Sequence, residues 1–194
     1  MQMTKNRLEG FSDGVIAIII TILVLQLEAP QGTDLKALAP LLPVFLTYIL
    51  SYIFLGIYWS NHHHLLQATK HVNGKILWAN LHLLFWLSLI PFVTEWMGEN
   101  HFESLPTALY GSVLLFAAIA YTILQTMIVH HHKGEDTTLE TAIGNDLKGK
   151  LSIVLYLIAI PMAFVFEWIS DLIYVSVAAM WLVPDRRIEK LMKE

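Results

Sequence analysis

The chain has 194 residues, of which 56% are hydrophobic and only 14% are charged, and its net charge at pH 7 is −4. Soluble globular domains carry about 25% charged residues, so this shortage of surface charge indicates a protein whose outer surface faces lipid. The chain has no cysteine, which excludes a disulfide framework, a thiolate metal site and a cysteine nucleophile.

Six apolar segments predict an all-α membrane protein that forms a single domain over residues 1–194. Each segment is near the roughly 20 residues needed to cross the hydrocarbon core, although the first and the sixth are short. Pro91 lies two-thirds along the third segment and is expected to bend it. A basic amphipathic cytoplasmic tail is predicted over 184–194. The predicted spans cover residues 11–27, 35–59, 76–97, 105–129, 151–168 and 172–183.

Lysine and arginine residues gather on one side of these spans. The N-terminus, the second and fourth connections and the tail carry eleven of the 12 basic residues, which leaves only Lys36 on the other side. Because cytoplasmic loops carry the excess of Lys and Arg, both termini are predicted to be cytoplasmic, in a multi-pass protein of the cell membrane. The opposite side is acidic, which concentrates cations. No nucleic-acid partner is expected.

Ionisable residues stand directly before the first apolar run. Arg7, Glu9 and Asp13 lie within seven residues of one another. Such groups at the edge of a membrane span are costly and indicate a functional site. A cleaved signal peptide is the alternative, but Glu9 and Asp13 interrupt its basic start, and the residues around Ala29 form a poor cleavage site.

One face of the first span combines a basic residue, large aliphatic side chains, a hydroxyl and, at the outer end, a carboxylate. This face follows from placing the residues at about 100° intervals around a helix. Asp13 lies off this face and must point at a neighbouring helix. Every face of the helix is apolar, so the pattern by itself favours ordinary core or lipid-facing positions. The residues of the face are Arg7, Phe11, Ile18, Thr21, Ile22, Leu25 and Glu28.

Three motifs on the first three spans resemble the signatures of the transmembrane protein 175 family, the lysosomal potassium channels and their bacterial relatives. They are Arg7-x-x-x-Phe11-Ser12-Asp13, Trp59-Ser60-Asn61-His62 and the run from Asn80 to Phe92. The resemblance implies a potassium-permeable cation channel in the lipid bilayer, not an enzyme, with no cofactor and with K⁺ as the permeant ion. The signature occurs once, whereas animal members resemble two such repeats, so a homotetramer is expected.

The resemblance also implies a pore lined by the first helix, with bulky aliphatic side chains at its narrowest ring. No Thr-Val-Gly-Tyr-Gly loop is present, so backbone carbonyls cannot replace the hydration shell of the ion. An apolar ring instead gates by dewetting and favours K⁺ over Na⁺ only weakly. Thr21 is expected to donate to the carbonyl of Ala17. The implied constriction is Ile18, Ile22 and Leu25 with Thr21 adjacent, and Glu28 is the implied pore mouth.

Arg7 and Asp13 are interpreted as structural rather than conducting residues. An aspartate at this depth needs a hydrogen-bond donor, and the candidates on other spans are Trp59, His62 and Asn80. The resemblance implies that these residues form a polar network, which ties the pore helix to the second and third helices. The predicted network is Arg7, Phe11, Ser12, Asp13, Trp59, His62 and Asn80.

Other classes remain as alternatives. A secondary transporter or another multi-pass protein would use Arg7, Asp13 and His62 as a polar cluster, although no pseudo-repeat is visible. A membrane enzyme would have to use Ser12, Asp13 and His62. No metal site is predicted, because adjacent histidines in 62–64 and 130–132 point in different directions. A haem site is disfavoured, since only His82 lies well inside a span.

Overall fold

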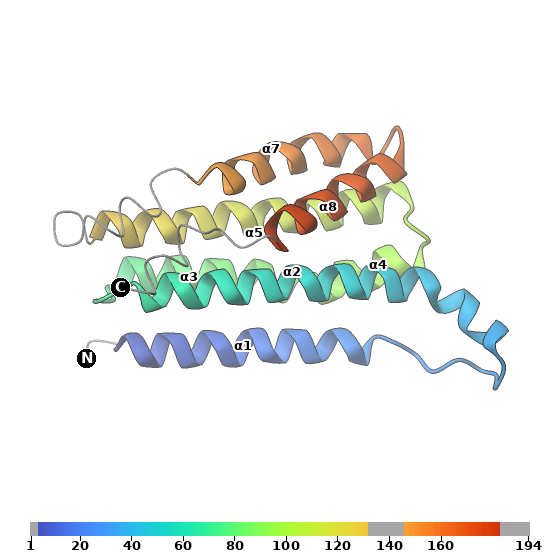
Figure 1. The fold of residues 1–194 in the computed structure, drawn as a ribbon, viewed down its shortest axis with the longest axis horizontal. Helices are drawn as coiled ribbons and strands as arrows, with labels where there is room; N and C mark the ends of the chain where they lie inside the picture. The colour runs from blue at the N-terminus through green and yellow to red at the C-terminus, as the bar shows by residue number, and fades with distance from the viewer. Residues whose placement is uncertain (1–3, 132–145, 183–194) are drawn as a thin grey trace.

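The chain forms an elongated bundle of helices (Figure 1), described here from a computed structural model that covers residues 4–131 and 146–182. The prediction of an all-α protein is confirmed for these residues, which form no strand. The loop 132–145 and the predicted tail 184–194 lie outside the described residues. The elements are α1 (Lys5–Leu25), η1 (Leu35–Leu41), α2 (Leu42–Gln67), α3 (Gly74–Ser88), α4 (Ile90–Glu99), α5 (Ser104–His131), α7 (Leu147–Met162) and α8 (Glu167–Leu182).

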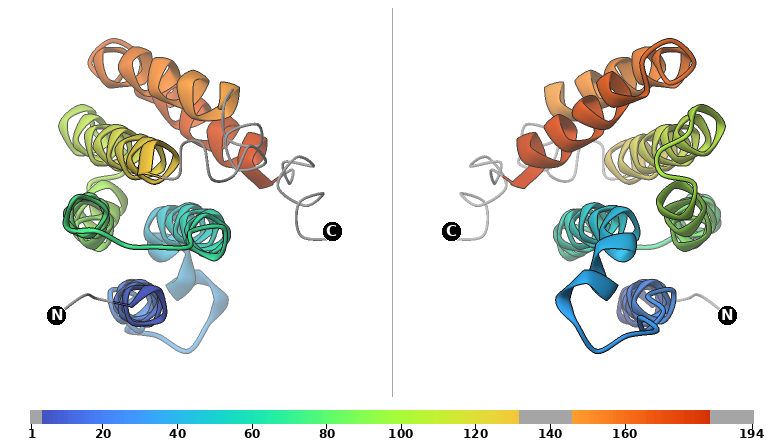
Figure 2. Two further views of the ribbon diagram at one scale, coloured as in Figure 1. Left: turned by 90° about the vertical axis from the view of Figure 1, so that its left-hand side faces the viewer. Right: turned by 90° about the vertical axis from the view of Figure 1, so that its right-hand side faces the viewer.

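Helix α1 lies at the edge of the bundle, beside α2 (Figures 1 and 2). It packs against α2, α3 and α4, while α7 and α8 lie on the opposite side of the bundle. Its buried residues recur at helical spacing and form one face: Leu8, Ser12, Ile16, Ile19 and Leu23. Helix α1 therefore contributes one face to the protomer core and presents its other face outward.

The second predicted span consists of a short 3-10 helix followed by α2. Asp34 caps the 3-10 helix, because its Oδ1 accepts a hydrogen bond from the backbone N of Ala37 at 3.1 Å. Helix α2 then continues beyond Trp59, where the sequence had suggested an end, to Gln67. Polar residues do not end a helix when their side chains are satisfied: Asn61 donates to the carbonyl of Ile57 at 2.8 Å.

The third predicted span is interrupted. Helix α3 starts at the cap Asn73, whose Oδ1 accepts from the N of Ile76 at 3.0 Å, and α3 ends at Ser88. Leu89 separates α3 from α4, in which Pro91 lies in the first turn. Proline has no backbone N–H and clashes with the carbonyl four residues earlier, so it breaks the hydrogen-bond ladder at the expected place.

Helix α5 is the central element and packs against α3, α4, α7 and α8. Small residues allow these close approaches. The ring of Tyr174 on α8 lies directly over Gly111, and its hydroxyl donates to the carbonyl of Thr107 at 3.1 Å. A side chain at residue 111 would collide with this ring, so the glycine sets the distance between α5 and α8.

Among the described residues, four helical segments are long and apolar enough to cross a membrane: Lys5–Leu25, Leu35–Gln67, Gly74–Glu99 and Ser104–His131. Helices α7 and α8 have 16 residues each. A helix of that length extends about 24 Å, against a hydrocarbon core of about 30 Å. The chain is thus a multi-pass membrane protein whose described part is helical, and two of the six predicted spans are shorter than a full crossing.

Candidate functional site

Three buried polar side chains link α1, α3 and α2 near the N-terminal end of α1. Ser12, Asn80 and His62 are all completely buried. His62 Nε2 lies 2.6 Å from Asn80 Oδ1, and Asn80 Nδ2 donates to Ser12 Oγ at 2.9 Å. Ser12 in turn donates to the carbonyl of Leu8 at 2.8 Å. An amide oxygen only accepts, so His62 carries its proton on Nε2, an assignment made from the network.

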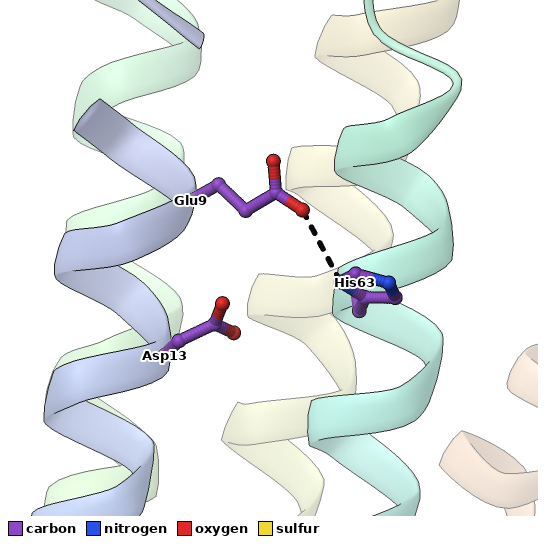
Figure 3. Close-up of side chains that lie close together, drawn as sticks. All are labelled: Glu9, Asp13 and His63. Atoms are coloured by element: carbon purple, nitrogen blue, oxygen red, sulfur yellow. Dashed lines mark ion pairs between the residues drawn. The ribbon is translucent and has the colours of Figure 1, made fainter. Parts of the chain in front are cut away.

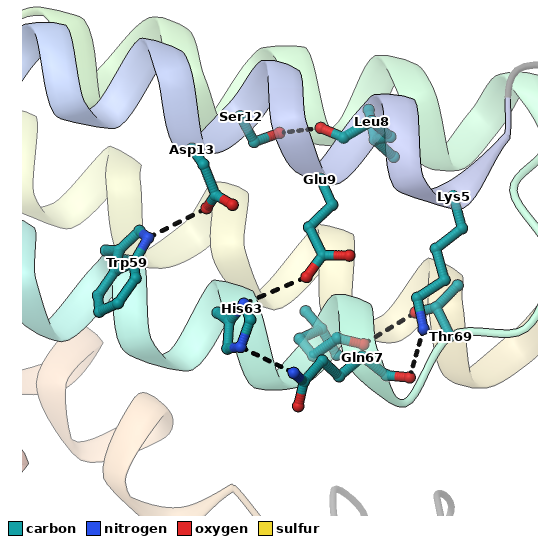
Figure 4. Close-up of polar contacts among 10 residues, drawn as sticks. Lys5, Leu8, Glu9, Ser12, Asp13, Trp59, His63, Gln67 and Thr69 are labelled. Carbon is teal, nitrogen blue, oxygen red and sulfur yellow. Dashed lines mark hydrogen bonds and ion pairs between the residues drawn. The ribbon is translucent and has the colours of Figure 1, made fainter.

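A second set of contacts joins the carboxylates of α1 to α2. Trp59 Nε1 donates to Asp13 Oδ1 at 3.0 Å. One turn closer to the N-terminus, Glu9 Oε1 lies 3.2 Å from His63 Nδ1 (Figure 3). Gln67 and His63 are also bonded, with 2.8 Å between their Nε2 atoms, and all these side chains follow the α1–α2 seam (Figure 4). Asp13 thus points at a neighbouring helix, as its position on the helical wheel predicts.

The predicted single network is in fact two separate systems. His62 and Asn80, which were candidate partners of Asp13, bond to each other and to Ser12, while Asp13 bonds to Trp59. The reason is helical phase: consecutive residues point about 100° apart, so Ser12 faces the core of the bundle and Asp13 faces α2.

Two members of the predicted network lie apart from both systems. Phe11 is 48% exposed, and Arg7 is exposed on the same side of α1. Within residues 4–131 and 146–182, the structure shows no side-chain hydrogen bond or ion pair of Arg7. Both residues share the helical phase of the outward face, which turns them away from α2 and α3.

The aliphatic positions of the predicted constriction lie on the outward face of α1. Ile18 is 59% exposed, Ile22 is 42% exposed and Leu25 is 80% exposed in the protomer. Thr21 is exposed beside them. We call Ile18, Thr21, Ile22 and Leu25 the α1 stripe. Its members share a face that the protomer itself leaves uncovered.

Two details of this face differ from the sequence-based expectations. The hydroxyl of Thr21 donates to the carbonyl of Ile18 at 2.8 Å, not to that of Ala17. A helical threonine has two accessible rotamers, and they bond to the carbonyl three or four residues earlier. Glu28 is exposed, but it lies beyond the end of α1 at Leu25, so a helical wheel does not give its direction.

Sequence reasoning marked Glu9 only as one of the ionisable residues before the first span and did not predict that it meets His63. The signal was present: Glu9 stands four residues before Asp13, and His63 stands four residues after Trp59. Residues four apart share a helix face, so both pairs extend the seam by one turn. Sequence reasoning also missed a contact at the C-terminal end of α1, where Gln26 Nε2 donates a hydrogen bond to Glu95 Oε2 of α4 at 2.9 Å.

The geometry defines a class: a multi-pass helical membrane protein with an edge helix that is fastened by polar contacts at both ends and has an uncovered apolar face. The family model for the endosomal/lysosomal potassium channel TMEM175 matches residues 7–91, which contain both polar systems and the α1 stripe. A potassium channel from Chryseobacterium sp. is 55% identical over 192 residues, 99% of this chain and 100% of that protein. One from Streptomyces collinus is 32% identical over 128 residues, 62% of each protein.

The fold agrees with these sequence relationships. The crystal structure of a lysosomal potassium-selective channel TMEM175 homolog from Chamaesiphon minutus superposes with a TM-score of 0.78 at 24% identity, and the match covers 92% of this chain and 96% of that one. The chain belongs to the TMEM175 family. This is a family of ion channels rather than enzymes, and it works without a cofactor.

Proposed function

We propose that the chain forms a potassium-permeable cation channel, weakly selective for K⁺ over Na⁺, in which α1 lines the pore. The observation that carries the proposal is the exposure of the α1 stripe. Ile18, Ile22 and Leu25 are outward while the opposite face of α1 is packed into the bundle. The family membership and the potassium-channel relatives support the permeant ion.

One protomer offers a single wall of a pore, so the proposed channel is a homotetramer in which four copies of α1 face a common axis. The packing of α1 supports this arrangement, because α1 is an edge helix and α7 and α8 lie on the far side of the bundle (Figure 2). Both termini are proposed to be cytoplasmic, in the cell membrane, from the distribution of Lys and Arg.

The proposed filter and gate is the ring formed by the α1 stripe. Isoleucine and leucine side chains offer no ligands, so a narrow ring excludes water and closes by dewetting. A wider ring passes ions that shed water readily, which favours K⁺ modestly. Thr21 differs from these aliphatic residues because it carries an oxygen. Its hydroxyl hydrogen is bonded to the carbonyl of Ile18, so the oxygen lone pairs remain free to coordinate a cation.

The two polar systems are proposed to fix the rotation of α1 about its own axis. The buried contacts to His62 and Asn80 and the Asp13–Trp59 hydrogen bond hold α1 from two directions. A turn of α1 would move the stripe off the pore axis and break these bonds. Exposed Glu28, beyond the end of the helix, is proposed to attract cations at the outer mouth.

Purified protein in liposomes under a potassium gradient tests the proposal. We expect a K⁺ current that needs no coupled substrate, and a detergent-solubilised complex whose mass corresponds to four chains. Transport that depends strictly on a co-substrate would instead support the secondary transporter that uses Arg7, Asp13 and His62. A monomeric mass together with full conductance would contradict a pore built from four α1 helices.

Replacing Thr21 with valine is expected to lower the K⁺/Na⁺ permeability ratio towards one. Valine has nearly the same shape but no oxygen, so a cation loses a contact of about 0.5–1.5 kcal/mol, the net contribution of one hydrogen bond. Reversal potentials in mixed K⁺ and Na⁺ solutions measure the ratio.

Thr126→Val is the matched control for this substitution. Thr126 is also exposed, and its hydroxyl also donates to a helix carbonyl, that of Thr122 at 2.7 Å, but it lies on α5. This variant should keep the original ratio. Equal selectivity in the Thr21 variant and the unmodified protein would remove Thr21 from the filter.

A further inference from the structure

Two carboxylates and one imidazole converge between α1 and α2 (Figure 3). Glu9, Asp13 and His63 each place one potential ligand atom so that all three atoms lie within 4.8 Å of one another. The side chain of His63 is 31% exposed and that of Glu9 is 21% exposed. The three side chains are therefore partly enclosed by the two helices, and the Nδ1 atom of His63 is itself buried without a hydrogen-bond partner among the described residues.

The local structure explains this convergence. Glu9 and Asp13 stand four residues apart on α1, which places both carboxylates on one helix face, one turn above the other. His63 lies on the face of α2 that packs against them, and its Nδ1 is 3.2 Å from Glu9 Oε1. The prediction of no metal site considered only neighbouring histidines of one helix, whereas this cluster takes a single histidine and draws its carboxylates from another helix.

We propose that Glu9, Asp13 and His63 form a binding site for one divalent transition-metal ion of the Zn²⁺ type. Zinc takes imidazole nitrogen and carboxylate oxygen at about 2.0–2.2 Å in a tetrahedron, which separates neighbouring ligand atoms by about 3.3 Å. The Glu9–His63 pair already has this spacing, and the Asp13 ligand atom lies within 4.8 Å of both other ligand atoms. Water supplies the fourth ligand from the exposed side.

Charge and ligand type both favour such an ion. Two carboxylates and a neutral imidazole carry a charge of −2, which a divalent cation neutralises, whereas a proton on His63 leaves one negative charge uncompensated. The imidazole nitrogen favours Zn²⁺ and similar transition metals over Mg²⁺ and Ca²⁺, which prefer sites made only of oxygen. A bound ion would connect α1 to α2 directly.

Neighbouring residues hold the three ligands in place. The ring of Trp59 stacks on that of His63, with a centroid distance of 5.9 Å and an interplanar angle of 20°. The same indole donates to Asp13 Oδ1, and a carboxylate has further lone pairs for a metal. The side-chain amide of Gln67 contacts His63 Nε2. If the nitrogen and oxygen of this amide are exchanged, its oxygen accepts a hydrogen bond from His63 Nε2–H. The Nδ1 atom of His63 is then left to face the metal.

Zinc titration of the purified, full-length protein in detergent tests this site without measuring current, so it does not depend on the proposed channel function. Competition with a chromophoric chelator at neutral pH gives the affinity and the stoichiometry. We expect one high-affinity Zn²⁺ per protomer, and a fall in affinity of about tenfold or more in Glu9→Gln and in His63→Gln, since even residues that only support metal ligands contribute that much.

His82→Gln is the matched control, because His82 is exposed on α3 and bonds to Trp86 rather than to the cluster. This variant should bind Zn²⁺ like the unmodified protein. Zinc should also raise the Tm of the unmodified protein and of His82→Gln, but not that of His63→Gln. Weak binding that is equal in all four proteins would show adventitious surface histidines only and would overturn the proposal.

Discussion

Ile18→Asn is expected to raise sodium permeability and to increase the leak of the closed channel. Ile18 is the N-terminal member of the α1 stripe and is 59% exposed in the protomer, so four copies would place four amides in the proposed constriction. An amide offers oxygen and N–H groups that hold water in a ring that isoleucine keeps dry. Each ~1.4 kcal/mol taken from the barrier raises the rate of ion passage tenfold.

Single-channel conductance and reversal potentials in Na⁺ and K⁺ solutions measure both effects. Ile158→Asn provides the matched control, since Ile158 is also exposed, at 48%, but lies on α7, on the side of the bundle far from α1. The control should conduct normally. If the Ile18 variant also keeps the original selectivity and closed-state leak, α1 does not form the constriction through Ile18.

Asn80→Leu is expected to destabilise the protein more than the proposed substitutions of Thr21, Ile18, Glu9 or His63. Leucine fills a similar volume but removes the acceptor of His62 Nε2–H and the donor to Ser12 Oγ, both in fully buried positions. A buried polar group left without a partner costs about 1–3 kcal/mol. For a chain of this size, each kcal/mol corresponds to about 2–4 °C in Tm, so we expect a fall in Tm of several degrees.

Thermal unfolding in detergent measures this change, and Asn100→Leu serves as its control. Asn100 is exposed and donates only to the carbonyl of Trp96 in the same turn, so its loss should cost less than about 0.5 kcal/mol. A further expected result is impaired gating in Asn80→Leu, because α1 loses its link to α2 through the buried chain. An unchanged Tm would show that the buried network contributes little to holding α1.

Several features of the site were readable from residue order. The positions of Asp13 and of the α1 stripe on different faces of one helix follow from the helical period, and the hydrogen bond from Trp59 to Asp13 agrees with it. The choice of Trp59 from among three candidate donors was not readable. The sequence places Trp59, His62 and Asn80 at a similar depth in the membrane. Depth alone does not say which of the three lies beside Asp13.

Helix boundaries show the same limit. The break before Pro91 follows from the chemistry of proline, and the structure places it at Leu89. The continuation of α2 through the histidines to Gln67 could not be inferred from polarity. His62 is buried there because Asn80 of α3 provides its partner, and that pairing exists only after α2 and α3 pack.

Composition and periodicity were sufficient for the membrane class, the helical fold and the grouping of residues on α1, because these depend on solvent preference and on the geometry of one helix. Which face of α1 is buried was decided only by the tertiary structure. Every face of this helix is apolar, so hydrophobicity does not distinguish the buried Ile16 and Ile19 from the exposed Ile18 and Ile22. The meeting of Glu9 and Asp13 with His63 likewise required the packing of α1 against α2.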